Sequence, residues 1–220
     1  MKLRVMTFNI QHCKNYISKK IDYKSIIDLI NKYNPDIIGL NEVYNIPNQT
    51  KIISNGKYYH FGKSSNIIIP YGNSIISKYN IVNNEIIKIK YSKSFKYIEN
   101  RSILKSIINI NNKLLNIYVV HLGLNDIEKE IGINTLINNL DDNSIVLGDF
   151  NMTPDNKLIK RLSNKLIDCT NIKDYTYPSD NPKDKLDYIY VSKNIKVINS
   201  FVLNEIISDH KAIISDIEIK

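Results

Sequence analysis

The stretch Ser144-Ile145-Val146-Leu147-Gly148-Asp149-Phe150-Asn151 carries the strongest structural signal in this chain. Its apolar, β-branched start is typical of a buried strand, and its polar end lies where that strand stops. A second segment, Ser208-Asp209-His210, stands directly before another apolar run, Ala212-Ile213-Ile214. Together the two segments offer carboxylates, an amide and an imidazole beside strands. These are the groups that metal-assisted hydrolysis of a phosphate ester requires.

Strand and helix signals recur along the whole chain. Apolar β-branched runs predict strands over 3–9, 36–41, 74–77, 103–110, 114–120, 145–147, 186–191, 196–203 and 212–217. Helical spacing predicts helices over 23–33, 125–140 and 155–162. Many strands with few helices predict an α/β fold in which two sheets pack together with the helices outside. Because neither a repeat nor a Gly/Ser linker divides the chain, we expect a single domain over 1–220.

The finer pattern gives further expectations for the helices and turns. In the first helix Ile26, Ile27, Leu29 and Ile30 form an apolar face, and Pro35 ends the pattern. In the second helix the residues expected to face inward are Ile127, Ile131, Leu136, Ile137 and Leu140. The asparagine pairs Asn83-Asn84, Asn111-Asn112 and Asn138-Asn139 predict turns.

Composition limits the classes of protein that the chain can represent. A hydrophobic fraction of 43% over 220 residues is enough for a sizeable core, and no run approaches the roughly 18 apolar residues of a membrane helix. With no secretory signal, we expect a cytoplasmic protein. The net charge of +8 comes almost entirely from lysine in a Lys-, Asn- and Ile-rich chain. This charge fits either a compositional bias or a surface that binds nucleic acid. Cys13 and Cys169 are expected to be reduced and without a catalytic role.

Polar residues that follow or precede strands are the candidates for a metal site. Asn9, Glu42 and Asp209 offer the oxygen ligands that a hard divalent cation prefers. The chain lacks the cysteine and closely spaced histidine patterns that zinc favours. The sequence therefore predicts a Mg²⁺ site, with Mn²⁺ as a substitute.

Further polar residues supply the groups for acid–base chemistry. Asp149 is expected to orient or deprotonate a water molecule, and Asn151 to hold that water or a phosphoryl oxygen. His210, supported by Asp187, is expected either to act as a general base or to stabilise developing charge. His121 is expected to hold a phosphoryl oxygen or to protonate the leaving group. His12 and His60 are expected to have no carboxylate partner and to be ordinary surface or core histidines.

The order of these motifs resembles the endonuclease/exonuclease/phosphatase superfamily. The matching segments, which span Met6 to His210, are Met6-Thr7-Phe8-Asn9-Ile10, Gly39-Leu40-Asn41-Glu42-Val43, Tyr71-Gly72-Asn73-Ser74-Ile75-Ile76-Ser77, Val119-Val120-His121-Leu122, Gly148-Asp149-Phe150-Asn151, Leu186-Asp187-Tyr188-Ile189 and Ser208-Asp209-His210. The resemblance implies a four-layer sandwich of two packed, mostly antiparallel β-sheets flanked by helices. It also implies a Mg²⁺-dependent phosphoesterase cleft at one edge.

Carried over by position, the resemblance implies a role for each matching residue. Glu42 would be the principal metal carboxylate, with Asn9 beside it and Asp209 near the metal. Asp149 and Asn151 would position water and phosphate, and Asp187 would orient His210. Asn73 and Arg101 match the cleft-lining amide and the phosphate-facing arginine that bind substrate. The chain departs from the family pattern at Asn41, where glutamine is usual, and at Lys185, near an arginine of many members.

The motifs also separate the branches of that superfamily. His121 after Val119-Val120 resembles the branch of deoxyribonuclease I and the sphingomyelinases. The absence of tryptophan is unlike the abasic-site endonucleases, and Asp184-Lys185-Leu186-Asp187 is unlike the inositol polyphosphate 5-phosphatases. We therefore expect a phosphodiesterase or nuclease with a nucleic acid or nucleotide as its favoured substrate. A phosphatase, a phospholipid-headgroup phosphodiesterase and an inactive binding module remain as alternatives.

Overall fold

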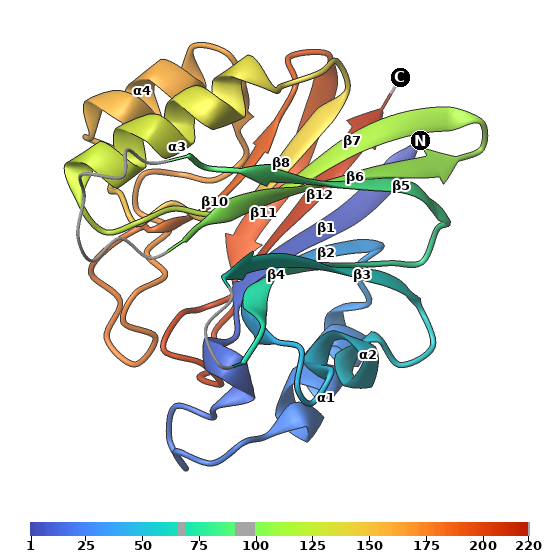
Figure 1. Cartoon of the computed structure of the whole chain (residues 1–220), viewed down its shortest axis with the longest axis vertical. Helices are drawn as coiled ribbons and strands as arrows, with labels where there is room; N and C mark the ends of the chain where they lie inside the picture. The colour runs from blue at the N-terminus through green and yellow to red at the C-terminus, as the bar shows by residue number, and fades with distance from the viewer. Residues whose placement is uncertain (66–68, 91–99, 220) are drawn as a thin grey trace.

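A computed structural model describes residues 1–65, 69–90 and 100–219. The strands of this part of the chain form two six-stranded sheets (Figure 1). In spatial order the first sheet contains β11 (Ile195–Val202), β12 (Ile213–Ile219), β1 (Lys2–Asn9), β2 (Ile37–Tyr44), β4 (Tyr71–Ser77) and β3 (Tyr58–Ser65). The second contains β5 (Ile81–Lys88), β6 (Ser102–Ile110), β7 (Lys113–His121), β8 (Ser144–Asp149), β10 (Asp187–Val191) and β9 (Ile167–Asp168). The helices are η1 (Gln11–Cys13), α1 (Tyr23–Tyr33), α2 (Gln49–Ser54), α3 (Asp126–Asn138) and α4 (Lys157–Ser163).

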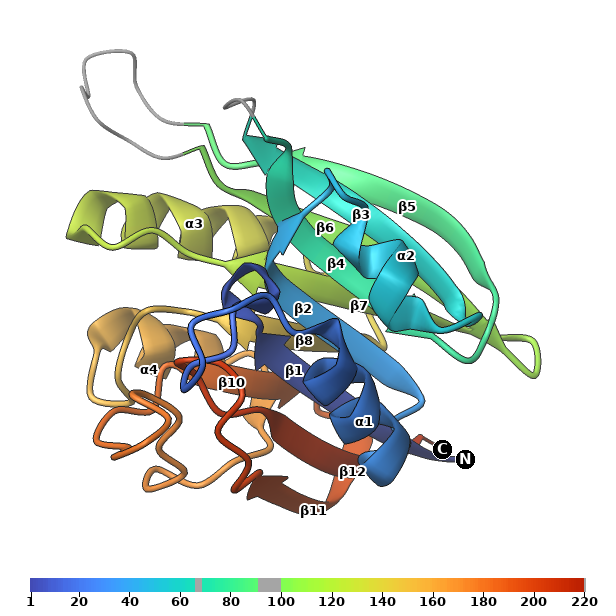
Figure 2. The ribbon, with the colours of Figure 1, turned by 90° about the horizontal axis from the view of Figure 1, so that it is seen from below.

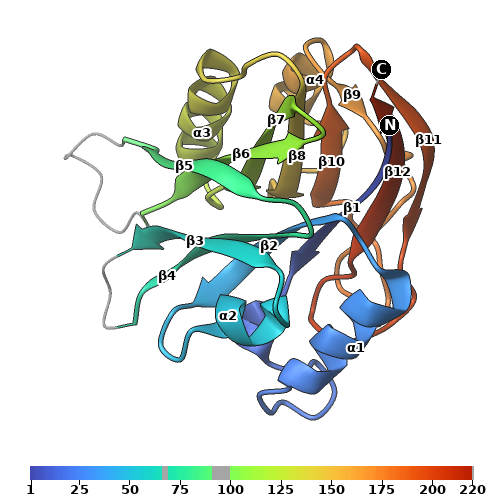
Figure 3. The same cartoon turned by 90° about the vertical axis from the view of Figure 1, so that its right-hand side faces the viewer.

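The two sheets pack face to face over a core of aliphatic side chains. Val5 and Ile37 of the first sheet belong to the same buried cluster as Val119 and Leu147 of the second. At Gly39 the sheets approach so closely that a Cβ atom would lie 2.8 Å from the Cβ atom of Leu147. Helices α1 and α2 cover the outer face of the first sheet, and α3 and α4 cover the second (Figure 3). The predicted four-layer sandwich is confirmed.

Each sheet contains one parallel strand pair joined through a helix. Strands β1 and β2 pair in parallel across α1, β7 and β8 pair in parallel across α3, and the remaining neighbours are antiparallel. Parallel strands end at the same edge of a sheet, so Asn9 pairs with Asn41 and His121 pairs with Asp149. Strand β10 runs the opposite way, and its first residue, Asp187, also pairs with Asp149. The topology thus brings the polar strand ends to one edge.

The other edge of the molecule carries the start of β1 and the end of β12, which lie side by side (Figure 2).

Helices α1 and α3 begin or end at capping residues that are close to them in the sequence. Asp22 caps α1 by accepting a hydrogen bond from Ser25 N, and the left-handed Asn34 ends it. In α3 the side chains of Asn125 and Glu128 form a reciprocal capping box.

Several details of the sequence prediction are wrong. The pattern did not predict the strands β3, β5 and β9 or the helix α2, and Asn83-Asn84 lies inside β5 instead of forming a turn. Strand β5 is an edge strand with an irregular register between Ile81 and Asn83, so it lacks a clean alternation of apolar residues. In α3, Ile127 is 46% exposed, whereas Ile133 is fully buried. Asn111-Asn112 forms the β6–β7 hairpin turn as predicted. The single-domain organisation stays a prediction.

Both cysteines are buried free thiols, as expected. Burial raises the pKa of Cys13 and raises the pKa of Cys169 to about 12, so neither thiol ionises near neutral pH. Within residues 1–65, 69–90 and 100–219, no helix has the length and apolar character needed to cross a bilayer.

Candidate active site

Asn9 links the two sheets at the edge where the parallel strands end. Its side chain is buried, and Nδ2 donates to Glu42 Oε1 at 3.3 Å and to Asp149 Oδ2 at 3.1 Å. Glu42 has a positive φ of 57° and lies at an irregularity of the β2–β4 pairing between Leu40 and Val43. This left-handed bulge turns the Glu42 side chain out of the regular strand alternation. One amide therefore holds a carboxylate from each sheet.

A second layer of amides lies beneath these residues. The backbone N–H of Asp149 donates to Asn41 Oδ1 at 3.1 Å, and Asn41 Nδ2 donates to Asn73 Oδ1 at 2.9 Å. Asn73 Nδ2 in turn donates to the carbonyl oxygens of Ser102 and Val119. Both amides are buried and hold the strand ends together. Asn73 thus supports Asn41 from inside the protein, and its role in substrate binding stays a prediction.

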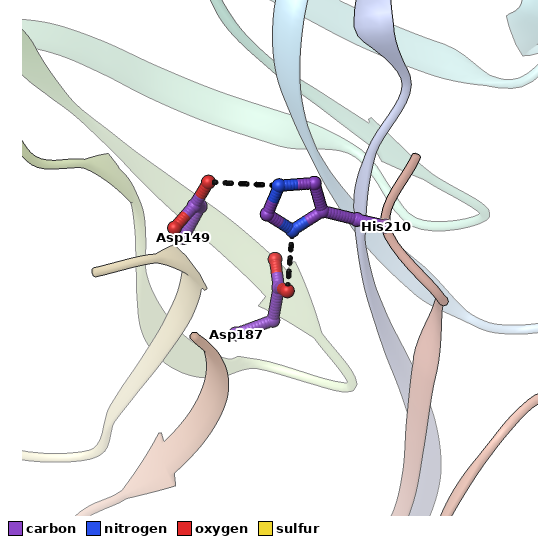
Figure 4. A group of neighbouring side chains, drawn as sticks. All are labelled: Asp149, Asp187 and His210. Carbon is purple, nitrogen blue, oxygen red and sulfur yellow. Dashed lines mark hydrogen bonds and ion pairs between the residues drawn. The ribbon is translucent and has the colours of Figure 1, made fainter. Parts of the chain in front are cut away.

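Asp149, Asp187 and His210 form a buried titratable cluster in the site (Figure 4). His210 Nδ1 donates to Asp187 Oδ2 at 2.8 Å, and His210 Nε2 lies 3.7 Å from Asp149 Oδ2. Asp149 Oδ1 accepts a hydrogen bond from the backbone N–H of Asn151 at 2.9 Å. Asn151 Nδ2 donates to the carbonyl of Leu122, which fixes the loop after β8 against the loop after β7.

A second histidine faces the same oxygen of Asp149. His121 Nε2 lies 3.7 Å from Asp149 Oδ2, and His121 Nδ1 lies 2.8 Å from Arg101 Nη1. Because a guanidinium can only donate, Nδ1 is the acceptor and the hydrogen of neutral His121 sits on Nε2. Arg101 Nη1 also donates to the hydroxyl of Tyr71 at 2.9 Å. Arg101 therefore fixes the tautomer that faces Asp149.

Asp209 approaches the site from the segment before β12. Gln11 Nε2 donates to Asp209 Oδ2 at 3.0 Å, and Ser208 Oγ donates to Oδ1. The carbonyl of Asp209 accepts from the backbone N–H of Ser179, which ties the segment to the loop before β10. The structure thus places Asp209 beside Gln11, close enough for its charge to act on Glu42.

The buried charges perturb several pKa values in opposite directions. Burial raises the pKa of Glu42 to about 7, with further increases from Asp209 and Asp149. Burial also raises the pKa of Asp149. Burial alone would lower the pKa of His210, but the carboxylates of Asp187 and Asp149 raise it to about 10. Burial and the nearby charge of Arg101 hold the pKa of His121 well below its usual range. At neutral pH one histidine is a cation and the other is neutral.

Two groups of side chains have the ligand types that a divalent cation needs. Asp149, Asp187 and His210 offer three ligand atoms within 4.8 Å of one another. In that group, however, the raised pKa of His210 favours a proton on the nitrogen that would have to ligate. Glu42 and Asp209 offer carboxylate oxygens, and Asn9 offers an amide oxygen. Burial is the main cause of the raised pKa of Glu42, and the charges of Asp209 and Asp149 add to it, so a nearby cation would stabilise the ionised form. These donor types are the ones that a hard divalent cation prefers.

The structure corrects one expectation at the site and adds residues to it. The expectation that His12 has no carboxylate beside it is wrong, because His12 Nε2 lies 3.5 Å from Glu42 Oε2. Gln11, Asn41 and Tyr71 also contact predicted site residues. In the sequence, the position of Gln11 and His12 just after Asn9 could have indicated that they lie near the site. The catalytic, metal-binding and substrate-binding roles of the site residues stay predictions.

Comparisons with known proteins find the same fold in solved structures. A structure from Leptotrichia buccalis, of the endonuclease/exonuclease/phosphatase family, is 22% identical, covers 99% of this chain and 100% of its own, and has a TM-score of 0.80. A mannosyl-6-phosphatase from Bacteroides thetaiotaomicron is 16% identical over 99% and 100%, with a TM-score of 0.83. The catalytic domain of human Nocturnin is 22% identical over 100% and 94%, with a TM-score of 0.80. These likenesses show the fold, and no curated protein matches the chain.

The family assignment comes from a family model. The model of the endonuclease/exonuclease/phosphatase family matches residues 6–210, nearly the whole chain. Members of this family hydrolyse phosphate esters. The matched range begins within β1 and ends at His210, so it includes every strand end that carries a candidate site residue. This chain belongs to the endonuclease/exonuclease/phosphatase family.

Proposed function

We propose that this protein is a Mg²⁺-dependent phosphodiesterase in which Mn²⁺ can replace Mg²⁺. The observation that carries the proposal is the surroundings of Asp149 Oδ2, which lies 3.7 Å from both His121 Nε2 and His210 Nε2. One of these histidines is neutral and the other is positively charged at neutral pH. Opposed protonation states around one carboxylate are typical of sites that carry out acid–base chemistry.

Glu42, Asp209 and Asn9 would hold the metal ion. When bound, the ion would supply Lewis-acid polarisation of a phosphoryl oxygen. Glu42 is the principal ligand in this proposal, as the family resemblance implies, and burial raises its pKa, so a nearby cation would stabilise its ionised form. Asn9 holds Glu42 and Asp149 at the same time, so it sets the spacing between the metal ligands and the acid–base cluster.

The remaining residues act on the water molecule and on the phosphoryl group. Ionised Asp149 orients the attacking water and accepts its proton. The His210 imidazolium, held by Asp187, stabilises the negative charge that develops on the phosphoryl oxygens. This is the second of the two roles expected for His210, and it is preferred because a pKa of about 10 leaves little neutral imidazole to act as a base. Asn151, Arg101 and the Nε2 hydrogen of neutral His121 bind phosphoryl oxygens. The P–O bond to the leaving group breaks as the water oxygen bonds to phosphorus, and the leaving oxygen takes up a proton from solvent.

The preferred substrate in this proposal is a phosphodiester of a nucleic acid or nucleotide. The net charge of +8 supports a polyanionic substrate in general terms. The likeness to a mannosyl-6-phosphatase keeps a phosphomonoesterase as the second candidate. A cytoplasmic location belongs to the same proposal, and cell fractionation would test it.

Hydrolysis of bis-p-nitrophenyl phosphate and of p-nitrophenyl phosphate, with and without Mg²⁺ or Mn²⁺, tests the proposal. We expect metal-dependent turnover with a preference for the diester, and a loss of about 10²-fold or more in His210→Gln and in Glu42→Gln. His60→Gln in β3 is the matched control and should keep full activity. Undiminished turnover in both site variants refutes the assignment, and a preference for the monoester replaces it with the phosphatase.

A further inference from the structure

The short η1 turn beside the site has an unusual backbone. Gln11, His12 and Cys13 follow one another with positive φ values of 43°, 57° and 63°. L-residues with side chains seldom adopt this conformation, and three in a row are costly. Such a segment persists only where the surrounding structure over-determines it, and strain of this kind concentrates at functional sites.

Buried contacts hold the turn in place. Gln49 Nε2 donates to the carbonyl of His12 at 2.8 Å, while Gln49 Oε1 accepts from the backbone N–H of Tyr44 at 2.9 Å. Cys13 is buried, and its carbonyl accepts from the backbone N–H of Asp22. Gln49 is itself buried and therefore fixes the turn relative to β2, the strand that carries Glu42.

The turn directs two side chains toward the two acidic candidates for metal ligation. Gln11 Nε2 donates to Asp209 Oδ2 at 3.0 Å, and His12 Nε2 lies 3.5 Å from Glu42 Oε2. The His12 ring stacks on Tyr44, with centroids 3.9 Å apart and an interplanar angle of 4°. His12 Nδ1 is buried and has no hydrogen-bond partner within the described part of the chain, so the hydrogen of a neutral ring is best placed on Nε2, toward Glu42.

We propose that the Gln11–His12 turn positions the two metal-binding carboxylates, with His12 holding Glu42 from its stacked position on Tyr44. His12 is a positioning residue in this arrangement, because it acts through Glu42. Outer contacts of this kind orient the ligands of a metal ion and raise its affinity. The inference rests on the proposed metal site. It gives a positioning role to the strained Gln11–Cys13 turn, which has no part in the proposed catalytic mechanism.

Binding of Mn²⁺ to the purified protein, followed by electron paramagnetic resonance, tests the inference without an activity assay. His12→Phe keeps an aromatic ring to stack on Tyr44 but removes the Nε2 hydrogen that faces Glu42. His12→Gln loses the ring but carries an amide donor with about the reach of Nε2, and Gln11 shows that glutamine adopts a positive φ in this turn. We expect the Mn²⁺ dissociation constant to rise about 10-fold or more in His12→Phe, and His12→Gln to restore most of that loss. His60→Phe is the control histidine and should bind as the wild type does.

Thermal melting of the metal-free variants separates positioning from folding. The inference requires weakened Mn²⁺ binding in a His12→Phe protein that still melts cooperatively. Wild-type affinity in His12→Phe overturns the inference and leaves the proposed function intact. Equal weakening in His12→Phe and His12→Gln also overturns it, because a donor at the position of Nε2 would then have no effect on Mn²⁺ binding. If the wild-type protein binds no Mn²⁺, both the inference and the proposed metal-dependent function are refuted.

Discussion

Replacing Asp187 with asparagine changes the protonation of His210 while preserving its hydrogen bond. The introduced amide still offers an oxygen to the Nδ1 hydrogen, which donates across 2.8 Å in the wild type. What the substitution removes is a buried negative charge, and among the groups that raise the pKa of His210 the Asp187 carboxylate contributes most. That pKa of about 10 lies about 3.5 above the ordinary value of 6.5, which corresponds to about 5 kcal/mol in favour of the imidazolium.

Without Asp187, burial opposes the remaining attractions of Asp149 and Asp209, and the pKa of His210 falls toward its ordinary value. An imidazole with the ordinary pKa of about 6.5 is about 3% protonated at pH 8, whereas the wild type is almost fully protonated there. If the imidazolium is the active form, Asp187→Asn loses about 30-fold in kcat at pH 8 from protonation alone. At pH 6 both proteins are mostly protonated, so the loss from this source nearly disappears.

The assay is the pH profile of bis-p-nitrophenyl phosphate hydrolysis from pH 6 to 9 at saturating Mg²⁺. The ratio of wild-type to variant kcat should grow steadily with pH. A constant ratio would refute the protonation argument and leave orientation of the ring as the role of Asp187. A ratio that shrinks with pH would show that neutral His210 is the active form.

Two further predictions follow from the charges of the fold. Because the pKa of Glu42 is raised to about 7, protons compete with the metal ion for this carboxylate below that pH. The affinity for Mn²⁺ should therefore rise between pH 5 and 7 and level off above pH 7. Calorimetric titrations that show a constant affinity over this range would contradict the role of Glu42. Asp168→Asn should cost about 3–5 kcal/mol in urea unfolding, because Lys185 is buried and its Nζ lies 2.6 Å from Asp168 Oδ2. The exposed Lys24–Asp28 pair is the control, where Asp28→Asn should leave the free energy of unfolding nearly unchanged. Similar losses of stability in the two variants would contradict the role of burial.

The sequence predicted correctly those strands and helices that are determined by the apolar pattern of neighbouring residues. The apolar run before Asp149 and the strand before His121 form the parallel pair β7 and β8, and their polar ends meet because parallel strands share an edge. The helix at Tyr23–Tyr33 is observed with the predicted bounds, since its apolar period and its ending signals agree. Residues of this kind could be assigned before the fold was known.

The sequence was uninformative wherever tertiary contacts decide the outcome. No local pattern shows that His12 lies against Glu42, because the left-handed turn that brings them together is held by Gln49 from a distant helix. The protonation of His210 is equally hidden, since it depends on two carboxylates from other strands. The edge strand β5 was missed because one face has little to pack against and its apolar alternation is weak.

The most direct test is the anomalous scattering of a crystal soaked in Mn²⁺. We expect a peak within about 2.5 Å of a Glu42 carboxylate oxygen, on the side of Asp209 and Asn9, with His210 Nδ1 still hydrogen-bonded to Asp187 and Nε2 free of metal. A peak ligated by His210 Nε2 would refute the proposed mechanism, because that nitrogen would then carry no proton to stabilise the phosphoryl group.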